Sequence, residues 1–326
     1  MSKPVALGID IGGTKTLCLL VDKRCRILRA EKFKTAQDGV QQFRTDLLRT
    51  LWSLRDYAAQ RKFKLLGVGL GLAGSIDPKN GRIKTAPNLL CLEGFPIERQ
   101  LTQALRAPVY IGNDVQLGIC AEHKLGAAIG CANVLGVFFG TGVGGALVLN
   151  NQLYLGASGI GGQVGAVLAQ PVGGPKAALS HGFLDRIASK AAITGEALIM
   201  AVKDWAPYLH KKVGTDLSKV TWGMLRKAVE RGDDRIEEML RARMRVVGIA
   251  LASIVNFINP DMLVLGGGLL SELRKLAVSE IEQGLREYLV PEVSAAVKVR
   301  AARLGSDAVA LGAANLALQN SQKNRA

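Results

Sequence analysis

A short apolar strand that runs into a carboxylate, two glycines and a hydroxyl constrains this chain more than any other feature. Residues 7–16 read LGIDIGGTKT, and the apolar residues 17–21 continue as a second strand. A tight glycine turn between two strands can bring backbone N–H groups and the hydroxyl of Thr14 close to a phosphate. The pattern lacks the helix-opening G-x-x-x-x-G-K-S/T of P-loop proteins. We therefore predict a β-hairpin that cradles phosphate, although a plain hairpin turn would carry the same glycines.

Two other apolar strands also end in glycine. Residues 134–139 lead into GTGVGG at 140–145, and residues 262–265 lead into three glycines at 266–268. Where side chains are missing, a phosphate or a purine ring can approach the backbone closely. Any one of these segments could be an ordinary turn. Three glycine-rich strand ends in one chain, two of them with a threonine, together indicate a nucleotide site.

Seven segments, in order along the chain, resemble the motifs of one family. The Asp10 turn and residues 140–145 look like its two phosphate motifs, and Asn113-Asp114 matches its catalytic pair. Residues 69–77 are similar to its G-x-P-G-x-x-D sugar loop, with Ala73 where proline is usual. The other matches are 86–89 (P-N-L), 156–165 (G-x-x-G-x-x-G-E-x-G-H) and 259–268 (the adenosine segment). The chain thus resembles the sugar-kinase branch of the actin-like ATPase superfamily and, within it, the ROK family of repressors, uncharacterised frames and sugar kinases.

The resemblance implies an α/β, two-lobed actin-like ATPase (ribonuclease H-like) fold, with a mixed sheet in each lobe and an interlobe cleft. The expected N-terminal lobe spans 1–113 and is completed by a C-terminal helix at about 305–320, whereas the C-terminal lobe spans 114–304. Apolar patterning agrees with this division. It predicts strands at 4–10, 16–22, 26–30, 65–72, 108–112, 132–139 and 144–149, and helices at 37–60, 115–125, 236–258 and 307–318.

The resemblance also implies the chemistry. Asp114 would be the general base that accepts the proton of a sugar hydroxyl as the γ-phosphate of ATP is transferred. Asp10 would hold Mg²⁺ through water, because this hard cation prefers oxygen ligands and keeps much of its hydration. Asn113-Asp114 could also simply cap the helix that follows, and both roles can coexist. By the same resemblance the sugar would contact Gly74, Asn88, Asn113, Gln163 and Asp185, and the nucleotide would contact Asp10, Gly12, Gly13, Thr14, Lys15, Gly140, Thr141, Gly142, Gly266, Gly267 and Gly268.

The chain departs from the family pattern where zinc and sugar are bound. Gln163 stands where the family has a glutamate that grips the sugar, and Ala166 stands where it has a zinc-binding histidine. Residues 167–180 contain no cysteine, and Asp185 takes the place of a second glutamate. Because a structural zinc site needs about four Cys or His ligands, we expect no zinc site. The five cysteines show no C-x-x-C spacing, which is typical of small buried hydrophobes in a reducing compartment.

Gln163 leaves two functions open. A carboxamide binds hydroxyl groups through weaker, neutral hydrogen bonds than a carboxylate does. The chain could therefore be a kinase for another hexose, an amino sugar or a modified sugar, or a catalytically retired protein that senses sugar or nucleotide. Asp10, Asn113, Asp114 and both Gly/Thr turns favour the kinase. The Asn113-Asp114 pair also argues against a general actin-like ATPase without a small acceptor.

Composition limits the partners. The 326 residues are 48% hydrophobic, which is enough for two packed lobes, and no apolar run reaches the length of a membrane span. With no N-terminal apolar signal segment either, we expect a cytoplasmic protein. The net charge of +15 suits anionic ligands such as ATP, but the basic residues are scattered, so nucleic-acid binding is not favoured. A homodimer is the default expectation, and the sequence leaves open whether ATP or polyphosphate is the donor.

Overall fold

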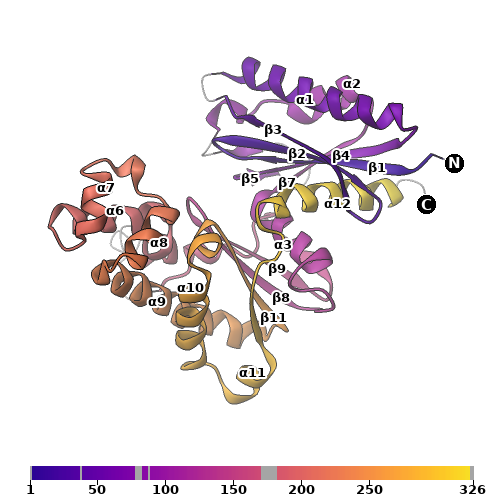
Figure 1. Cartoon of the computed structure of the whole chain (residues 1–326). Coiled ribbons are helices and arrows are strands. Elements are labelled where there is room, and N and C mark those ends of the chain that lie inside the picture. The colour runs from indigo at the N-terminus through magenta and orange to yellow at the C-terminus, as the bar shows by residue number, and fades with distance from the viewer. Residues whose placement is uncertain (1, 37–38, 78–82, 87–88, 170–181, 324–326) are drawn as a thin grey trace. The chain divides into compact units, whose positions relative to one another are not determined.

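The computed structural model describes residues 2–323 except 37–38, 78–82, 87–88 and 170–181. The chain forms two compact units (Figure 1). Unit 1 consists of Met1–Ile129, Leu155–Gly161 and Ser306–Ala326, and unit 2 consists of Gly130–Tyr154 and Gly162–Gly305.

Unit 1 is built on a mixed five-stranded sheet with the order β3-β2-β1-β4-β7. The first three strands form an antiparallel meander, and β4 and β7 run parallel to β1. The apolar spacing of α1 buries Phe43, Leu47 and Leu51 in the core on one face of this sheet. The bounds are β1 (Pro4–Ile11), β2 (Lys15–Asp22), β3 (Ile27–Lys34), α1 (Val40–Gln60), β4 (Lys64–Leu72), β5 (Ser75–Ile76), β6 (Ile83–Thr85), η1 (Leu90–Leu92), α2 (Ile97–Leu105), β7 (Val109–Asn113), α3 (Asp114–Leu125) and α12 (Ala308–Lys323).

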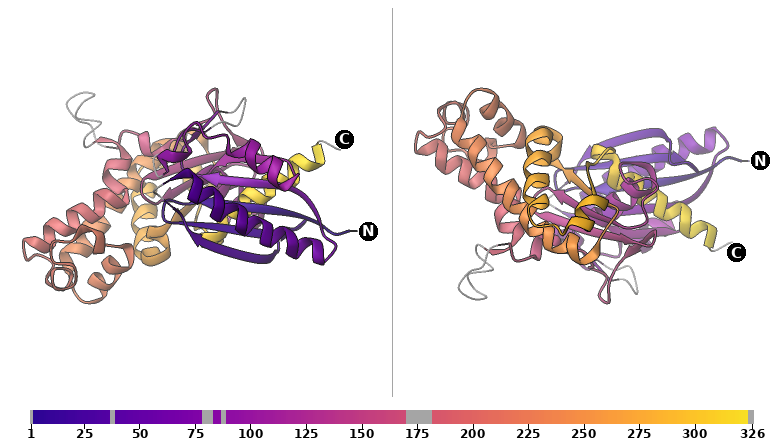
Figure 2. Two further views of the ribbon diagram at one scale, coloured as in Figure 1. Left: turned by 90° about the horizontal axis from the view of Figure 1, so that it is seen from above. Right: turned by 90° about the horizontal axis from the view of Figure 1, so that it is seen from below.

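Helix α12 lies directly against the backbone of the unit 1 sheet. A Cβ on Gly8 of β1 would lie 1.9 Å from the carbonyl oxygen of Ala310, and a Cβ on Gly69 of β4 would lie 1.9 Å from that of Ala313. Only glycine permits this approach. Figure 2 shows α1 and the yellow α12 on opposite faces of the sheet. A segment from the end of the described chain therefore completes a unit that is otherwise built mostly from its first 129 residues.

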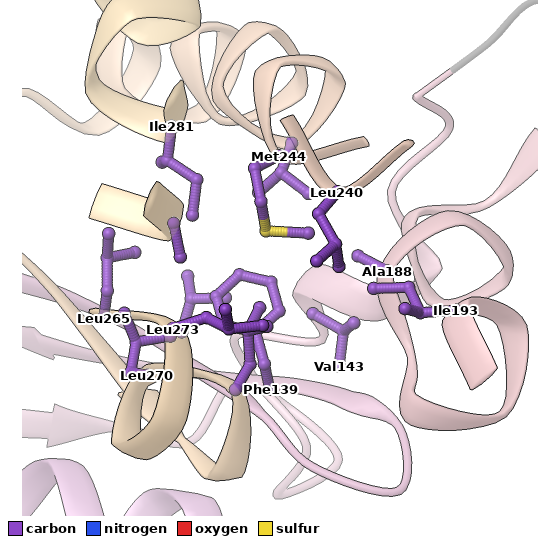
Figure 3. Close-up of a cluster of buried hydrophobic side chains, with 14 of the residues drawn as sticks. Phe139, Val143, Ala188, Ile193, Leu240, Met244, Leu265, Leu270, Leu273 and Ile281 are labelled. Carbon is purple, nitrogen blue, oxygen red and sulfur yellow. The ribbon is translucent and has the colours of Figure 1, made fainter. Parts of the chain in front are cut away.

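Unit 2 contains a second mixed five-stranded sheet, with the order β10-β9-β8-β11-β12. β8, β11 and β12 run parallel, while β9 and β10 are antiparallel additions at one edge. The long helix α9 buries Ile236, Leu240 and Met244 in the core of unit 2, and Figure 3 labels Leu240 and Met244 there. The helix ends at Ile258, and the next residue, Asn259, has a φ of 50°. The bounds are β8 (Val134–Phe139), β9 (Val143–Leu149), β10 (Gln152–Tyr154), η2 (Val164–Ala166), α5 (Leu184–Ala188), α6 (Lys190–Val202), α7 (Pro207–Val213), η4 (Leu217–Lys219), α8 (Trp222–Glu230), α9 (Asp234–Ile258), β11 (Met262–Gly267), α10 (Gly268–Arg286), α11 (Pro291–Ala296), β12 (Lys298–Ala301) and η5 (Gly305–Asp307).

The expected α/β fold with a mixed sheet in each unit is confirmed. The expected interlobe cleft and the expected division at residue 114 stay predictions. Helix α3, which begins at Asp114, belongs to unit 1. Among the described residues, no helix combines the length and the apolar character that a membrane crossing requires.

Candidate functional site

The first glycine turn closes the hairpin between β1 and β2, as the sequence predicts. The N–H of Gly12 donates to the carbonyl oxygen of Lys15 at 3.1 Å, and Thr14 is exposed. Thr35, which follows β3, fixes the turn from outside: its N–H donates to the carbonyl oxygen of Thr14 and its hydroxyl to that of Gly12, at 3.0 and 2.8 Å. The hydroxyl of Thr35 also lies 3.0 Å from that of the buried Thr16. The turn is therefore held in one conformation by a side chain that the motif does not include.

Asp10 and Asp114 come from strand ends on the same edge of the unit 1 sheet. Asp10 pairs with Gly71 of β4, and Gly71 pairs with Gly112 of β7. Asn113 follows at the end of β7, and α3 begins at Asp114. Because Gly71 and Gly112 have no side chains, Leu117 of α3 and Val309 of α12 can pack closely against the row between the two carboxylates. The residues predicted to hold Mg²⁺ and to act as base thus lie at strand ends that are separated by one strand, β4.

This arrangement raises the pKa values of both carboxyl groups. Burial, and then the negative charge of Asp114, raise the pKa of Asp10 to about 7, although the ammonium group of Lys15 acts in the opposite direction. Burial also raises the pKa of Asp114, while hydrogen bonds from the backbone N–H groups of Val115 and of Asp114 itself lower it. A carboxyl group whose pKa is raised in this way is suited to accepting a proton or binding a cation.

Asn113 fastens the Asp114 helix to the predicted sugar loop. Its Oδ1 accepts a hydrogen bond from the N–H of Gln116 at 3.1 Å, so it is the N-cap residue of α3. Its Nδ2 donates to the carbonyl oxygen of Gly74 at 3.0 Å. The cap role considered from the sequence is therefore present. A carboxamide has a further N–H and a further lone pair that a sugar hydroxyl could use. Asn88, predicted to contact the sugar, lies outside the described residues.

The second glycine turn joins β8 to β9 in unit 2. The N–H of Gly140 donates to the carbonyl oxygen of Gly142 at 2.8 Å, and Thr141 and Gly142 are exposed. Gly267 pairs with Phe139 at the end of β8, so the predicted nucleotide residues Gly266, Gly267 and Gly268 lie beside this turn. Gly266 packs against the ring of Phe138. The ring of Phe138 therefore occupies part of the space beside the backbone of Gly266.

The segment that carries Gln163 packs on the first residues of β9. A Cβ on Gly145 would lie 2.5 Å from the carbonyl oxygen of Gly162, and a Cβ on Gly165 would lie 2.3 Å from that of Val143. Gln163 itself is exposed at the start of η2. Its predicted contact with sugar is thus accessible to a ligand of unit 2.

Asp185, the other predicted sugar residue of unit 2, has a partner within the protein. Its Oδ1 accepts a hydrogen bond from the N–H of Val143 at 2.7 Å. Unit 2 therefore brings Gly140–Gly142, Gln163, Asp185 and Gly266–Gly268 to one end of its sheet. Sequence reasoning missed Asp185 as a partner of the glycine turn, and it missed Thr35 as a partner of the first turn. A lone Asp or Thr far from the motif carries no signal for such a bond.

Within the described part of the chain, no three His, Cys, Asp or Glu side chains form a group that could hold a metal ion. The five cysteines are all free. Burial raises the pKa of the Cys120 thiol to about 12, so this group stays protonated at neutral pH.

Known proteins share this architecture along nearly the whole chain. Glucokinases of Halalkalibacterium halodurans and Thermotoga maritima are 29% and 28% identical, over 96% and 97% of this chain and 94% and 98% of their own. The crystal structure of a ROK hexokinase from Thermus thermophilus has a TM-score of 0.79 at 29% identity and covers 98% of this chain and 99% of its own. A ROK family glucokinase from Streptomyces griseus, solved in complex with glucose and AMPPNP, has the same TM-score at 27% identity, over 97% of this chain and 99% of its own.

Repressors are also similar to this chain. The N-acetylglucosamine repressor of Escherichia coli O157:H7 is 24% identical over 85% of this chain and 66% of its own length. The sequence profile of the ROK family matches residues 6–320, a span that includes both sheets and every candidate site residue described above. On this extent of agreement, the chain belongs to the ROK family.

Proposed function

We propose that the protein is an ATP-dependent sugar kinase that uses Asp114 as its general base. The observation that carries the proposal is the half-buried pair of carboxylates, Asp10 and Asp114, which are separated by one strand, β4, and lie beside a glycine turn. A repressor that only binds sugar has no need for a second carboxylate that raises the pKa of the first. Repulsion between buried carboxylates is typical of sites that move protons or bind cations.

In this proposal Asp114 accepts the proton of one sugar hydroxyl. The hydroxyl oxygen bonds to the γ-phosphorus of ATP, and the bond from that phosphorus to the bridging oxygen of ADP breaks. The raised pKa of Asp114 makes it a stronger base than an ordinary carboxylate, which favours the transfer. The cap bond of Asn113 and the bond of Asp114 to Val115 fix the base at the start of α3.

Asp10 fits the binding of a hydrated Mg²⁺. It is a hard oxygen ligand, and the neighbouring negative charge of Asp114 favours a cation there. When bound with the nucleotide, Mg²⁺ would offset negative charge on the phosphates. In the first turn the exposed hydroxyl of Thr14 provides a donor for phosphate oxygens. In unit 2 the N–H groups of Thr141 and Gly142 have no partner among the described residues, so they are the donors we assign to the nucleotide there.

The alternative is a retired kinase that senses sugar or nucleotide. Gln163 favours it, because the exposed carboxamide removes a charge from the predicted sugar contact. Similarity to a sugar-responsive repressor also keeps this alternative open. One assay can identify the hexose, amino sugar or modified sugar that is bound. The same assay shows whether polyphosphate can replace ATP as the donor.

A coupled assay with a panel of hexoses, amino sugars and anhydrosugars tests the proposal, with ATP and polyphosphate as donors. We expect at least one sugar to be phosphorylated with a turnover number within the usual 1–10³ s⁻¹ of enzymes. Thermal unfolding with each sugar runs in parallel. If a sugar raises the melting temperature but no donor phosphorylates it, the sensor is correct and the kinase is not.

Replacing Gln163 with glutamate should improve the use of glucose. A charge-assisted hydrogen bond is stronger than a neutral one by about 1 kcal/mol or more, so KM for glucose should fall about fivefold or more while kcat changes little. Steady-state kinetics of Gln163→Glu measure this. Gln152→Glu, which adds the same charge to the exposed β10, is the control and should leave KM unchanged. An unchanged KM in Gln163→Glu would remove residue 163 from the sugar contact.

A further inference from the structure

The second glycine turn is bonded on both sides by one short segment, residues 185–190. On the β9 side, Asp185 Oδ1 accepts the N–H of Val143 at 2.7 Å. On the β8 side, the N–H of Lys190 donates to the carbonyl oxygen of Gly140 at 3.1 Å. Neither bond is part of the hydrogen-bond ladder between β8 and β9, so both restrain the turn in addition to that ladder.

The carboxylate of Asp185 also fills the space beside the turn. A Cβ on Gly142 would lie 2.7 Å from Asp185 Oδ1, closer than any real contact of that kind. A side chain at 142 would therefore require this carboxylate to shift from its position beside the N–H of Val143. The φ of Gly142 is not positive, so the contact with Asp185 is the constraint that the structure places on this position.

Both partners are anchored in the core of unit 2. Figure 3 shows Phe139 and Val143, which flank the turn, in the same cluster as Ala188 of α5. Leu184, directly before Asp185, is fully buried in this cluster too. A carboxylate on so short a helix is thus held rigidly, and the bond to the N–H of Val143 transmits that rigidity to the turn.

The same carboxylate borders the segment that bears Gln163. A Cβ on Gly165 would lie 2.3 Å from the carbonyl oxygen of Val143 and 3.4 Å from Cβ of Asp185. The N–H of Leu184 donates to the carbonyl oxygen of Val167 at 2.9 Å. Asp185 therefore lies beside three parts of unit 2: the second glycine turn, the segment that carries Gln163, and the start of α5.

We propose that Asp185 is a positioning residue for the nucleotide, which sets the N–H groups of Thr141 and Gly142 toward phosphate and joins the turn to the Gln163 segment. The family resemblance instead expects a sugar contact at this position. This inference rests on the proposed function only in taking a nucleoside triphosphate as the ligand of the turn. The residue is one methylene shorter than the glutamate of the family pattern, and its oxygen is already engaged by Val143.

The charge of Asp185 distinguishes its two possible roles, which are positioning the glycine turn and binding sugar. As a positioning residue it needs an acceptor oxygen, and its negative charge is unfavourable beside a phosphate. Asp185→Asn keeps the acceptor and removes the charge, so nucleotide affinity should stay the same or improve. Asp185→Ala removes the acceptor and frees the turn, so nucleotide affinity should fall at least tenfold. If Asp185 bound sugar, Asp185→Asn would weaken the sugar contact by losing its charge-assisted bond.

The experiment measures the dissociation constant of AMPPNP with Mg²⁺ by calorimetry, without sugar, and KM for the best sugar by steady-state kinetics. We expect Asp185→Ala to bind AMPPNP at least tenfold more weakly, and Asp185→Asn to bind it within threefold of wild type or more tightly. KM for sugar should change less than threefold in Asp185→Asn. Asp233→Ala is the matched control, because the buried Asp233 likewise accepts backbone N–H groups in unit 2, those of Tyr208 and Leu209. It should lower the melting temperature without changing nucleotide affinity.

Each outcome decides. Wild-type AMPPNP affinity in a folded Asp185→Ala, or a sugar KM that rises tenfold in Asp185→Asn, overturns the positioning role and leaves the kinase intact. If Asp185→Ala fails to fold, the Asp185→Asn values decide alone. If the wild-type protein phosphorylates no sugar but binds AMPPNP, and Asp185→Ala binds AMPPNP more weakly, the kinase is refuted and the positioning role of Asp185 is supported. A wild-type protein that binds no nucleotide overturns both.

Discussion

Asp114→Asn should reduce turnover by about 10²–10⁴-fold, the range typical for the loss of a general base. The substitution keeps the size of the side chain and an oxygen that can accept the N–H of Val115, so α3 should begin as before. AMPPNP affinity should stay within about threefold of wild type, because neither glycine turn is altered. The wild-type enzyme should also lose turnover as the pH falls toward the raised pKa of Asp114, since only the ionised carboxylate accepts a proton.

The measurement is kcat and KM for the best sugar over pH 5–9, with Asp56→Asn as the control. Asp56 is an exposed residue of α1 in the same unit, so its variant should match wild type. Wild-type turnover in Asp114→Asn would mean that Asp114 serves only the start of α3 and that the base lies elsewhere.

Asp10→Asn should abolish most activity and yet stabilise the ligand-free protein. An unfolded aspartate ionises near pH 4, whereas the folded pKa of Asp10 is about 7. Between these values the folded state holds more protons than the unfolded state, so the free energy of unfolding falls as the pH rises from 4 to 7. Asparagine never ionises. The variant should therefore exceed wild type by up to about 4 kcal/mol at pH 8, from a rise of about three in the pKa, and match it near pH 4.

Thermal unfolding of Asp10→Asn and wild type at several pH values, without ligand, tests whether the variant becomes the more stable protein as the pH rises. Turnover with Mg²⁺-ATP should fall at least about 10²-fold, because the carboxylate assigned to the cation and phosphates is gone. Sugar binding in the absence of nucleotide should persist. A stability difference that does not depend on pH would mean that the pKa of Asp10 is the same in the folded and unfolded states, so that neither burial nor Asp114 raises it.

The fold could be predicted from the sequence because its signals are local. The strand before Asp10 and the helix that ends at Ile258 are read from apolar periodicity within one element, and α12 was expected close to where it lies. The Asn113-Asp114 pair was placed correctly after a strand, because a strand that ends in Gly-Asn-Asp leaves its polar groups at the sheet edge.

The supports of the two turns could not be predicted, because each joins residues far apart in the chain. Thr35 contacts Gly12 across 23 positions, and Asp185 contacts Val143 across 42. Nothing in a threonine or an aspartate shows which backbone group it will face. The loss of the zinc pattern indicates that packing, and not a metal, shapes the segment around Ala166. It does not indicate that this segment packs against β9 and Asp185.

The glycines that let α12 touch β1 and β4 also affect how the protein is made. About 190 residues separate Asn113 from Ala308, so a ribosome adding roughly 5–20 residues per second leaves the first sheet without this helix for on the order of 10–40 s. During that interval the Gly8 and Gly69 face is bare backbone and apolar surface, while all of unit 2 is being synthesised. The sheet of unit 1 therefore stays incomplete until α12 is synthesised, by which time all of unit 2 has been made. We expect chaperones that bind exposed apolar segments to associate with the nascent chain until α12 emerges.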